Sequence, residues 1–277
     1  MTETQAKPII RVQDVTVAYG DFVVVRDVSF EVMAGEIFAI LGGSGSGKST
    51  ILKSMIGLIT PAKGRVLIDG TDIVTAEGAD LLALLRKIGV MYQNGALFGS
   101  MNLLENICLV LEEFTDLPRP ALERIARMKL KVVNLDGAEY KMPAELSGGM
   151  RKRAAIARAM ALDPMILFLD EPSAGLDPIT SAQLDELILK LSRTLQVTFV
   201  VVTHELPSIF KIADRTIMLD QRVKTIVATG KPSELRDRSD NPWVRQFFHR
   251  EAEVAAENDR EAVAAAKLVT EDIGRQT

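Results

Sequence analysis

Cysteine, aromatic residues and long apolar runs are all scarce in this sequence of 277 residues. The single cysteine, Cys108, excludes an intramolecular disulfide and suits a reducing compartment. The longest apolar runs, such as residues 197–202, fall far short of the ~20 residues needed to cross a bilayer, and the polar start MTETQAKP predicts no signal peptide. We therefore expect a protein that is soluble by itself and reaches a membrane only through a partner chain.

The sequence also lacks a strong excess of either charge. The 33 Lys and Arg residues against 37 Asp and Glu residues give a net charge of −4, and the sequence pI is about 5.4. This balance argues against nucleic acid or an anionic membrane surface as the main partner. The length and the 47% content of hydrophobic residues allow one large domain or two small ones with a substantial core.

Residues 42–50, GGSGSGKST, fit the phosphate-loop pattern G-x-x-x-x-G-K-[ST]. The apolar run over residues 37–41 predicts a buried strand before the loop, and helical spacing follows it. Glycines let the backbone curl and turn its N–H groups toward phosphate oxygens, beside the positive end of the helix. Lys48 supplies charge for the outer phosphates, and Ser49 a hydroxyl for Mg²⁺. The predicted nucleotide-binding residues here are Gly42, Gly43, Ser44, Gly45, Ser46, Gly47, Lys48, Ser49 and Thr50.

The residues before this loop have a β pattern. Residues 9–17 and 22–33 predict strands of an antiparallel sheet beside an α/β core. Tyr19 lies at the turn between them. It can stack on an adenine ring, or it can be a tyrosine half buried at the edge of the sheet.

A polar side chain ends the next strand of the core. Residues 88–93 predict a buried strand whose last residue is Gln93, and ligands bind at the carboxyl ends of such strands. Gln93 can therefore contact the metal or the attacking water. The alternative is a strand-end glutamine satisfied by the backbone.

Strand signals cease from residue 94 to about 143, and helical patterns appear at 102–113 and 118–133. This block predicts an inserted helical subdomain, about residues 94–162, that ends with a strong helix over 150–162. Most of the basic residues that begin this helix are expected on a solvated face or in salt bridges. They are Arg151, Lys152, Arg153 and Arg158.

Ser147 is placed to cap that last helix, and Gly148 and Gly149 leave backbone N–H groups open. This is either a second anion-binding helix start or an ordinary capped helix. Because it has no lysine, we interpret it as a site built to meet phosphate bound to another chain.

Two carboxylates and a histidine follow two further buried strands. Asp170 and Glu171 end the apolar run 165–169, where an acid pair is costly unless a cation or catalysis justifies it. Asp170 fits a metal-side ligand, and Glu171 can orient or deprotonate water. Asp177 starts the next predicted helix. His204 ends the strand after it and can reach a terminal phosphate, although a lone histidine is more often a hydrogen-bonded structural residue.

The last segment, residues 251–277, is alanine-rich and holds seven acidic residues and three basic ones, which accounts for the whole net charge. It predicts either a mobile or partly helical tail or a partner-binding extension.

Six motifs now stand in order, and together they resemble the ATPase subunit of ABC transporters over residues 9–235. They are GGSGSGKST, Gln93, LSGGM, ILFLDEP, SAGLD and His204. The resemblance implies an α/β fold: a RecA-like P-loop NTPase core with an antiparallel β subdomain and an inserted α-helical subdomain. It implies an ATPase domain over residues 1–250 that uses ATP and Mg²⁺, and residues 251–277 as a C-terminal extension.

The resemblance also implies roles for the candidate residues. Tyr19 stacks on adenine, Asp170 and Gln93 lie at the magnesium, Glu171 is the catalytic base and His204 senses the γ-phosphate. The group Ser147, Gly148 and Gly149 acts in trans on the ATP of a second copy, with Asp177 at the same seam. Met150 replaces a common glutamine, and Glu205 a common aspartate.

Residues 93–107 (QNGALFGSMNLLENI) and 241–248 (NPWVRQFF) narrow the resemblance to ATPases of the Mla group, which maintains lipid asymmetry. It implies a homodimer at the cytoplasmic face of the bacterial inner membrane. The implied partners are permease subunits, a small regulatory subunit and an MCE lipid-binding protein, with phospholipid as cargo and no nucleic acid. The alternatives are an ABC ATPase for another cargo and a soluble, non-transport ABC ATPase.

Overall fold

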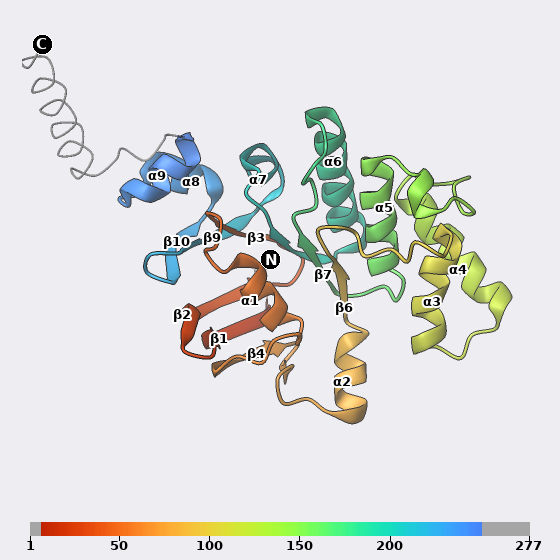
Figure 1. Cartoon of the computed structure of the whole chain (residues 1–277), viewed down its shortest axis with the longest axis horizontal. Coiled ribbons are helices and arrows are strands. Elements are labelled where there is room, and N and C mark those ends of the chain that lie inside the picture. Colours follow the sequence, from red (N-terminus) through yellow and green to blue (C-terminus); the bar gives the residue numbers. More distant parts are fainter. Residues whose placement is uncertain (1–6, 251–277) are drawn as a thin grey trace, which may run out of the picture.

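The computed structural model describes residues 7–250 of the chain and contains two β-sheets (Figure 1). The smaller sheet is antiparallel, with strand order β2-β1-β4-β5. This sheet confirms the antiparallel subdomain predicted from residues 9–17 and 22–33. Its strands are β1 (Pro8–Tyr19), β2 (Phe22–Met33), β4 (Lys63–Ile68) and β5 (Thr71–Asp72).

The larger sheet is mainly parallel, with strand order β10-β9-β3-β8-β7-β6. Every residue of β3, β7 and β8 is buried, as the continuous apolar runs predict for parallel strands covered on both faces. Only the edge strand β10 pairs antiparallel. The strands are β3 (Ile37–Gly42), β6 (Ile88–Met91), β7 (Ile166–Asp170), β8 (Thr198–Val202), β9 (Arg215–Asp220) and β10 (Thr225–Gly230).

Alternate residues of β7 face different cores, because side chains on a strand alternate between its two faces. Ile166 and Phe168 pack with the antiparallel sheet and helix α1, whereas Leu167 and Leu169 pack with the helical end of the molecule. The parallel sheet is therefore the shared wall between two hydrophobic cores. Figure 1 shows the antiparallel sheet below this wall and helices α3, α4 and α5 to its right.

The predicted helices form with few changes at their ends. The helix after the phosphate loop begins at Lys48 rather than Thr50, and the one after Ser147 begins at Gly148. The helices are α1 (Lys48–Met55), α2 (Gly78–Leu85), α3 (Leu103–Phe114), α4 (Arg119–Val132), α5 (Gly148–Ala159), α6 (Pro178–Leu195), α7 (Leu206–Ile212), α8 (Pro232–Arg238) and α9 (Pro242–His249).

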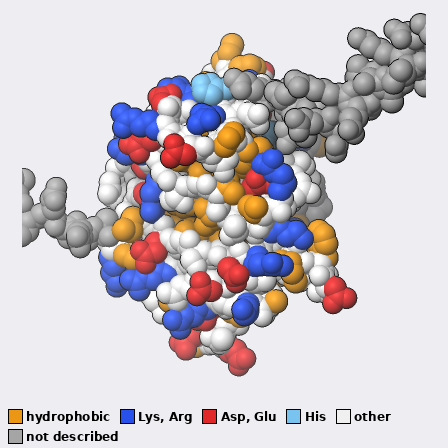
Figure 2. Space-filling view, turned by 90° about the vertical axis from the view of Figure 1, so that its left-hand side faces the viewer, with side chains coloured by type: hydrophobic (Ala, Val, Ile, Leu, Met, Phe, Trp, Pro, Cys, Tyr) orange, Lys and Arg blue, Asp and Glu red, His pale blue; other side chains and the backbone are white. Residues whose placement is uncertain are grey.

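Helices α7 and α9 were not predicted. Both begin with a proline in the first turn, and Asn241 caps α9 by accepting a hydrogen bond from the Trp243 backbone N–H at 3.0 Å. These are local start signals that hydrophobic periodicity over only seven or eight residues does not show. Within residues 7–250, no helix is long and apolar enough to cross a bilayer. On the face drawn in Figure 2, acidic and basic side chains alternate, so no patch of one sign covers it.

Gly89 provides a test of how tightly α5 packs on the sheet. A Cβ at this position in β6 would lie 2.1 Å from the carbonyl oxygen of Ala159 and 2.7 Å from Leu167 Cδ2. We expect Gly89→Ala to lower the free energy of unfolding by about 1–3 kcal/mol, because backbone must move to make room. Gly99→Ala is the control, since a Cβ there meets nothing within 4 Å. Equal denaturation midpoints for the two variants would contradict this packing.

Candidate functional site

The phosphate loop connects β3 to α1, and at two positions its path leaves space only for glycine. A Cβ on Gly42 (φ +148°) would lie 2.4 Å from the carbonyl oxygen of Leu219. A Cβ on Gly47 (φ +93°) would lie 2.4 Å from Val25 Cγ1. Both φ angles also disfavour any L side chain. The glycines thus let the loop press against β9 and β2 while it curls toward the start of α1.

Lys48 folds back over the loop that precedes it. Its Nζ donates hydrogen bonds to the carbonyl oxygens of Gly42 at 2.9 Å and Gly43 at 2.8 Å. Burial lowers the pKa of Lys48, and the negative charges of Glu171 and Asp170 oppose that shift. The ammonium is therefore partly desolvated and held at the loop, which strengthens its attraction for an anion.

Asp170 and Ser49 meet beside the loop. Asp170 is the last residue of β7, and its Oδ1 is 3.4 Å from the Ser49 hydroxyl. Burial, and then the neighbouring charge of Glu171, raise the pKa of Asp170 above its usual value. Two carboxylates at one strand end need a cation to offset this cost. The two predicted metal-side oxygens thus come from opposite sides, one from α1 and one from β7.

Glu171 points a different way from Asp170 and pairs with His204. Its Oε1 is 2.8 Å from His204 Nδ1. Its other oxygen, Oε2, is buried and has no hydrogen-bond partner among the described residues. A buried acceptor left without a partner costs roughly 1–3 kcal/mol, so this oxygen marks a position where water or substrate belongs.

Lys48, Ser49, Glu171 and His204 line one cavity of about 640 Å³, whereas Asp170, next to Ser49, does not line it. It collects side chains and backbone from the ends of β3, β6, β7 and β8, as parallel strands do at their carboxyl edge. The predicted residues that line it are Gly42, Gly43, Ser44, Gly45, Lys48, Ser49, Gln93, Glu171 and His204.

The donor set fits a magnesium ion carried in with phosphate. Within residues 7–250, no group of three or more His, Cys, Asp or Glu side chains could hold a metal ion. Mg²⁺ does not need such a cage, because it is usually held by one or two protein oxygens together with water and phosphate oxygens. Ser49 and Asp170 provide two such oxygens, and Gln93 lines the cavity next to them.

Other predicted residues lie outside this cavity. Tyr19 ends β1 with 55% of its surface exposed, and Ser46, Gly47 and Thr50 belong to the loop and α1 without lining the cavity. Ser46 is buried, and its hydroxyl has no hydrogen-bond partner within the described part of the chain.

The Ser147 group forms a separate feature. Ser147 caps α5 as predicted, since its hydroxyl accepts a hydrogen bond from the Met150 N–H at 3.2 Å. Gly148 lines a second cavity of about 280 Å³ together with Gln93, Arg151 and Lys152, while Gly149 packs against Thr180. Asp177 caps α6 through the N–H groups of residues 179 and 180. Within one copy, the phosphate loop and the Ser147 group thus line different cavities.

Lys152 departs from what the sequence predicts. We expected most basic residues of this helix on a solvated face, yet Lys152 is buried and donates hydrogen bonds to the carbonyl oxygens of Gln93 at 2.6 Å and Glu171 at 3.0 Å. Helix α9 also contributes unpredicted residues, because Phe247 and Arg250 line the phosphate-loop cavity. The spacing of Lys152 on α5 gave no signal of burial, since its neighbours are also basic.

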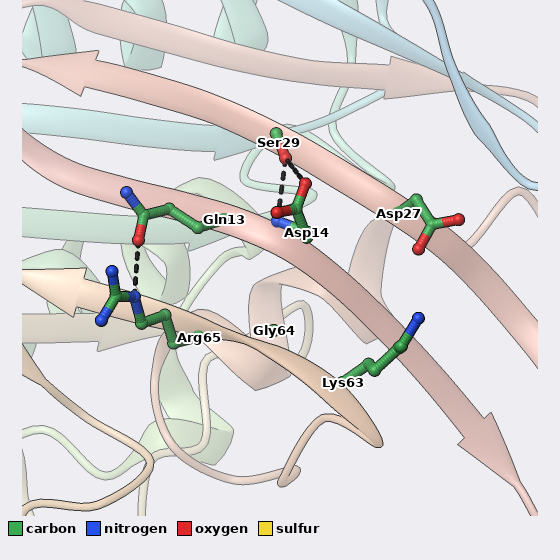
Figure 3. Close-up of a pocket in the computed structure, with 7 residues that line it drawn as sticks. All are labelled: Gln13, Asp14, Asp27, Ser29, Lys63, Gly64 and Arg65. Atoms are coloured by element: carbon green, nitrogen blue, oxygen red, sulfur yellow. Dashed lines mark hydrogen bonds between the residues drawn. The ribbon is translucent and has the colours of Figure 1, made fainter.

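A larger cavity, about 850 Å³, lies on the antiparallel sheet and shares no lining residue with the phosphate-loop cavity (Figure 3). Its side chains form hydrogen bonds with one another. The Ser29 hydroxyl donates to Asp14 Oδ1 at 2.9 Å, and Arg65 Nε donates to Gln13 Oε1 at 2.6 Å. No buried, unpartnered polar atom within the described residues belongs to its lining. Chemistry rather than size therefore places the candidate site at the phosphate loop.

Comparison with known proteins agrees with this geometry. The family model described as "ABC transporter" matches residues 25–174, more than half of the chain. The chain belongs to the ABC transporter family. As an ABC ATPase it binds and hydrolyses ATP with Mg²⁺, and a similar solved structure, the ATP-binding cassette MJ0796 bound to ADP and Pi, has a TM-score of 0.73 and 31% identity over 80% of this chain and 98% of that one.

Two similar curated proteins are named for the transport of different cargoes. The intermembrane phospholipid transport system ATP-binding protein MlaF of Escherichia coli K12 is 41% identical over 89% of this chain and 90% of its own length. The probable ribonucleotide transport ATP-binding protein Mkl of Mycobacterium leprae is 43% identical over 87% of this chain. The chain spans about two thirds of the length of the mycobacterial relatives, 68% for this one.

Lys48 allows the first test of the site. We expect Lys48→Ala to weaken ATP binding by about 10- to 100-fold, because hydrogen bonds to a charged group contribute about 1.5–3 kcal/mol each. Titration with a fluorescent ATP analogue measures this. Lys53→Ala, which removes an exposed lysine of the same helix, is the control and should bind as the wild type does. Unchanged affinity in Lys48→Ala would mean that the cavity is not the phosphate site.

Proposed function

We propose that this chain is the ATP-hydrolysing subunit of an ABC transporter that moves phospholipids between the inner and outer membranes of a bacterium. The observation that carries the proposal is the 41% identity to MlaF over 90% of its length, since this relative's name states intermembrane phospholipid transport. A second MlaF, from Haemophilus influenzae, is 39% identical over 84% of the chain. The Mkl relatives, named for ribonucleotide transport, support the alternative of another cargo.

The candidate residues in and beside the cavity have distinct roles in the proposed mechanism. Lys48, the N–H groups of the loop and His204 stabilise negative charge on the terminal phosphate, where preorganised groups provide most of the acceleration. Ser49, Asp170 and Gln93 hold Mg²⁺, which when bound neutralises charge on the phosphate oxygens. Glu171 is held through Oε1 by His204 and accepts the proton of the attacking water on its carboxylate.

Two copies of the chain act together in this proposal. They close head to tail on two ATP molecules, so that Ser147, Gly148 and Gly149 of one copy contact the ATP held by the phosphate loop of the other. Asp177 lies at the same seam, and Tyr19 stacks on the adenine. Two observations support this arrangement: the two groups line different cavities in one copy, and the similar cassette MJ0796 is described as dimeric.

The remaining partners follow from the proposed transport system. The ATPase pair acts as a peripheral assembly on permease subunits at the cytoplasmic face of the inner membrane, with a small regulatory subunit and an MCE lipid-binding protein. We propose residues 1–250 as the ATPase domain, with residues 94–162 as its helical subdomain. The extension over residues 251–277, for which a partner-binding role was one prediction, lies outside the described residues.

Glu171→Gln tests the chemical step. The amide keeps the shape of the side chain but cannot take a proton, so we expect hydrolysis to fall by about 10²- to 10⁴-fold while ATP still binds. Phosphate release by the purified transporter and ATP titration measure the two effects. Glu113→Gln, which changes an exposed acid on α3, is the control. Turnover near that of the wild type in Glu171→Gln would refute the role of the base.

Purification of the assembled transporter tests the cargo. We expect the tagged full-length chain, extracted from membranes in mild detergent, to bring down a permease, an MCE protein and bound phospholipid. Mass spectrometry of the proteins and lipids provides the readout. A permease that copurifies with a soluble binding protein and no enriched phospholipid would contradict the lipid cargo and favour the alternative.

A further inference from the structure

Lys152 is a buried cation whose partners are backbone carbonyls rather than a carboxylate side chain. It lies in the second turn of α5, is 8% exposed, and its Nζ donates hydrogen bonds to the carbonyl oxygens of Gln93 and Glu171. Lys129 of α4 is also buried, yet it forms an ordinary ion pair with Asp163. Burial of an ammonium costs free energy, so its placement against two backbone carbonyls calls for a functional explanation.

The two carbonyls lie just beyond the end of a strand pair. In the parallel ladder of β6 and β7, Met91 pairs with Leu169, and this is the last paired position. Gln93 and Glu171 each follow two residues later, so they lie side by side where the backbone no longer pairs. Lys152 spans this gap from the helix above and joins the two chain segments that carry the candidate amide and the candidate base.

The backbone of Glu171 has an unusual conformation that depends on such contacts. Its φ of +47° lies in the left-handed region, which disfavours residues other than glycine. Its N–H donates to the carbonyl oxygen of Val202 at 2.8 Å, and its own carbonyl accepts from the Ala174 N–H at 3.2 Å as well as from Lys152. Strained positions of this kind persist only where surrounding contacts hold them.

The charges around Lys152 also favour its position between the two strand ends. Burial lowers the pKa of Lys152, whereas the negative charges of Glu171 and Asp170 favour the ammonium. A cation between the two strand ends therefore offsets part of the repulsion within the acid pair while it binds the backbone.

From these contacts we propose that Lys152 is a positioning residue that fixes the backbone of Glu171 and Gln93, and thereby aims the carboxylate and the amide at the nucleotide. This inference rests on the proposed role of Glu171. It gives α5 two functions: Ser147, which caps the helix, meets the partner's nucleotide in the proposed dimer, and Lys152, in its second turn, holds the chain's own base.

The test compares Lys152→Met with Lys129→Met in the full-length chain within its purified transporter. Methionine keeps most of the length of lysine and loses its hydrogen bonds. We expect Lys152→Met to lower kcat by about 10- to 100-fold, since small displacements of catalytic groups have effects of this size, with KM for ATP within about threefold. Lys129→Met removes an equally buried lysine far from the cavity and should keep kcat within twofold.

ATP titration of Lys152→Met shows whether the variant is folded. If it does not bind ATP, Lys152→Leu, a smaller apolar side chain that also lacks N–H donors, takes its place in the same comparison. A kcat within twofold of the wild type in either folded variant would overturn the proposal, and so would a loss that appears only in KM.

A double variant separates positioning of Glu171 from a general effect. If Lys152 acts through Glu171, adding Lys152→Met to Glu171→Gln should lower the residual rate by less than about twofold, because groups that act as a unit are not additive. Losses that multiply would contradict the proposal. If Glu171→Gln itself is active, the proposed role of Glu171 as the base fails; if only Lys152→Met is active, this inference alone fails.

Discussion

The parallel alignment of β3, β8, β7 and β6 is the constraint on which the rest of the structure depends. Parallel strands end at the same edge of a sheet, and each of these strands is followed there by a different reactive group. The loop of Lys48 follows β3, Gln93 follows β6, Glu171 follows β7 and His204 follows β8. The strands themselves contribute apolar side chains to two cores, which makes this edge rigid. The reactive groups are therefore held in place by hydrophobic packing that does not contact the nucleotide.

That edge concentrates charge that is costly to bury. Four charged residues lie close to it: Lys48, Asp170, Glu171 and Lys152. Burial lowers the pKa of Lys48 and Lys152 and raises the pKa of Asp170, which in each case favours the neutral form. The opposing charges of the group reduce the cost but leave one oxygen of Glu171 without a partner among the described residues. An anionic nucleotide and its bound cation would complete the balance of charge at this edge.

The sequence was sufficient to predict most of this arrangement. A phosphate loop between a buried strand and a helix is a local pattern, and the polar residues at strand ends follow from the rule that ligands bind at the carboxyl edge. The cap of α5 by Ser147 and the antiparallel sheet were predicted for similar local reasons. ABC family membership and the use of ATP follow from the comparisons as well.

The unpredicted part depends on contacts between distant segments. Lys152 stands in a run of basic residues, and only the packing of α5 over the ends of β6 and β7 shows that this one is buried. Phe247 and Arg250 reach the cavity because the short helix α9 folds back over it, which no periodicity in the sequence signals. The position of Gly148, next to Ser147, in a different cavity likewise required the fold.

The central claim is that each nucleotide is bound between two copies of the chain. A cryo-EM structure of the transporter carrying Glu171→Gln, with ATP and Mg²⁺, tests it most directly. The account predicts that the Ser147 hydroxyl and the N–H groups of Gly148 and Gly149 lie within hydrogen-bond distance of the triphosphate held by Lys48 of the other copy. A closed, ATP-filled assembly with these groups far from the partner's phosphates would contradict it.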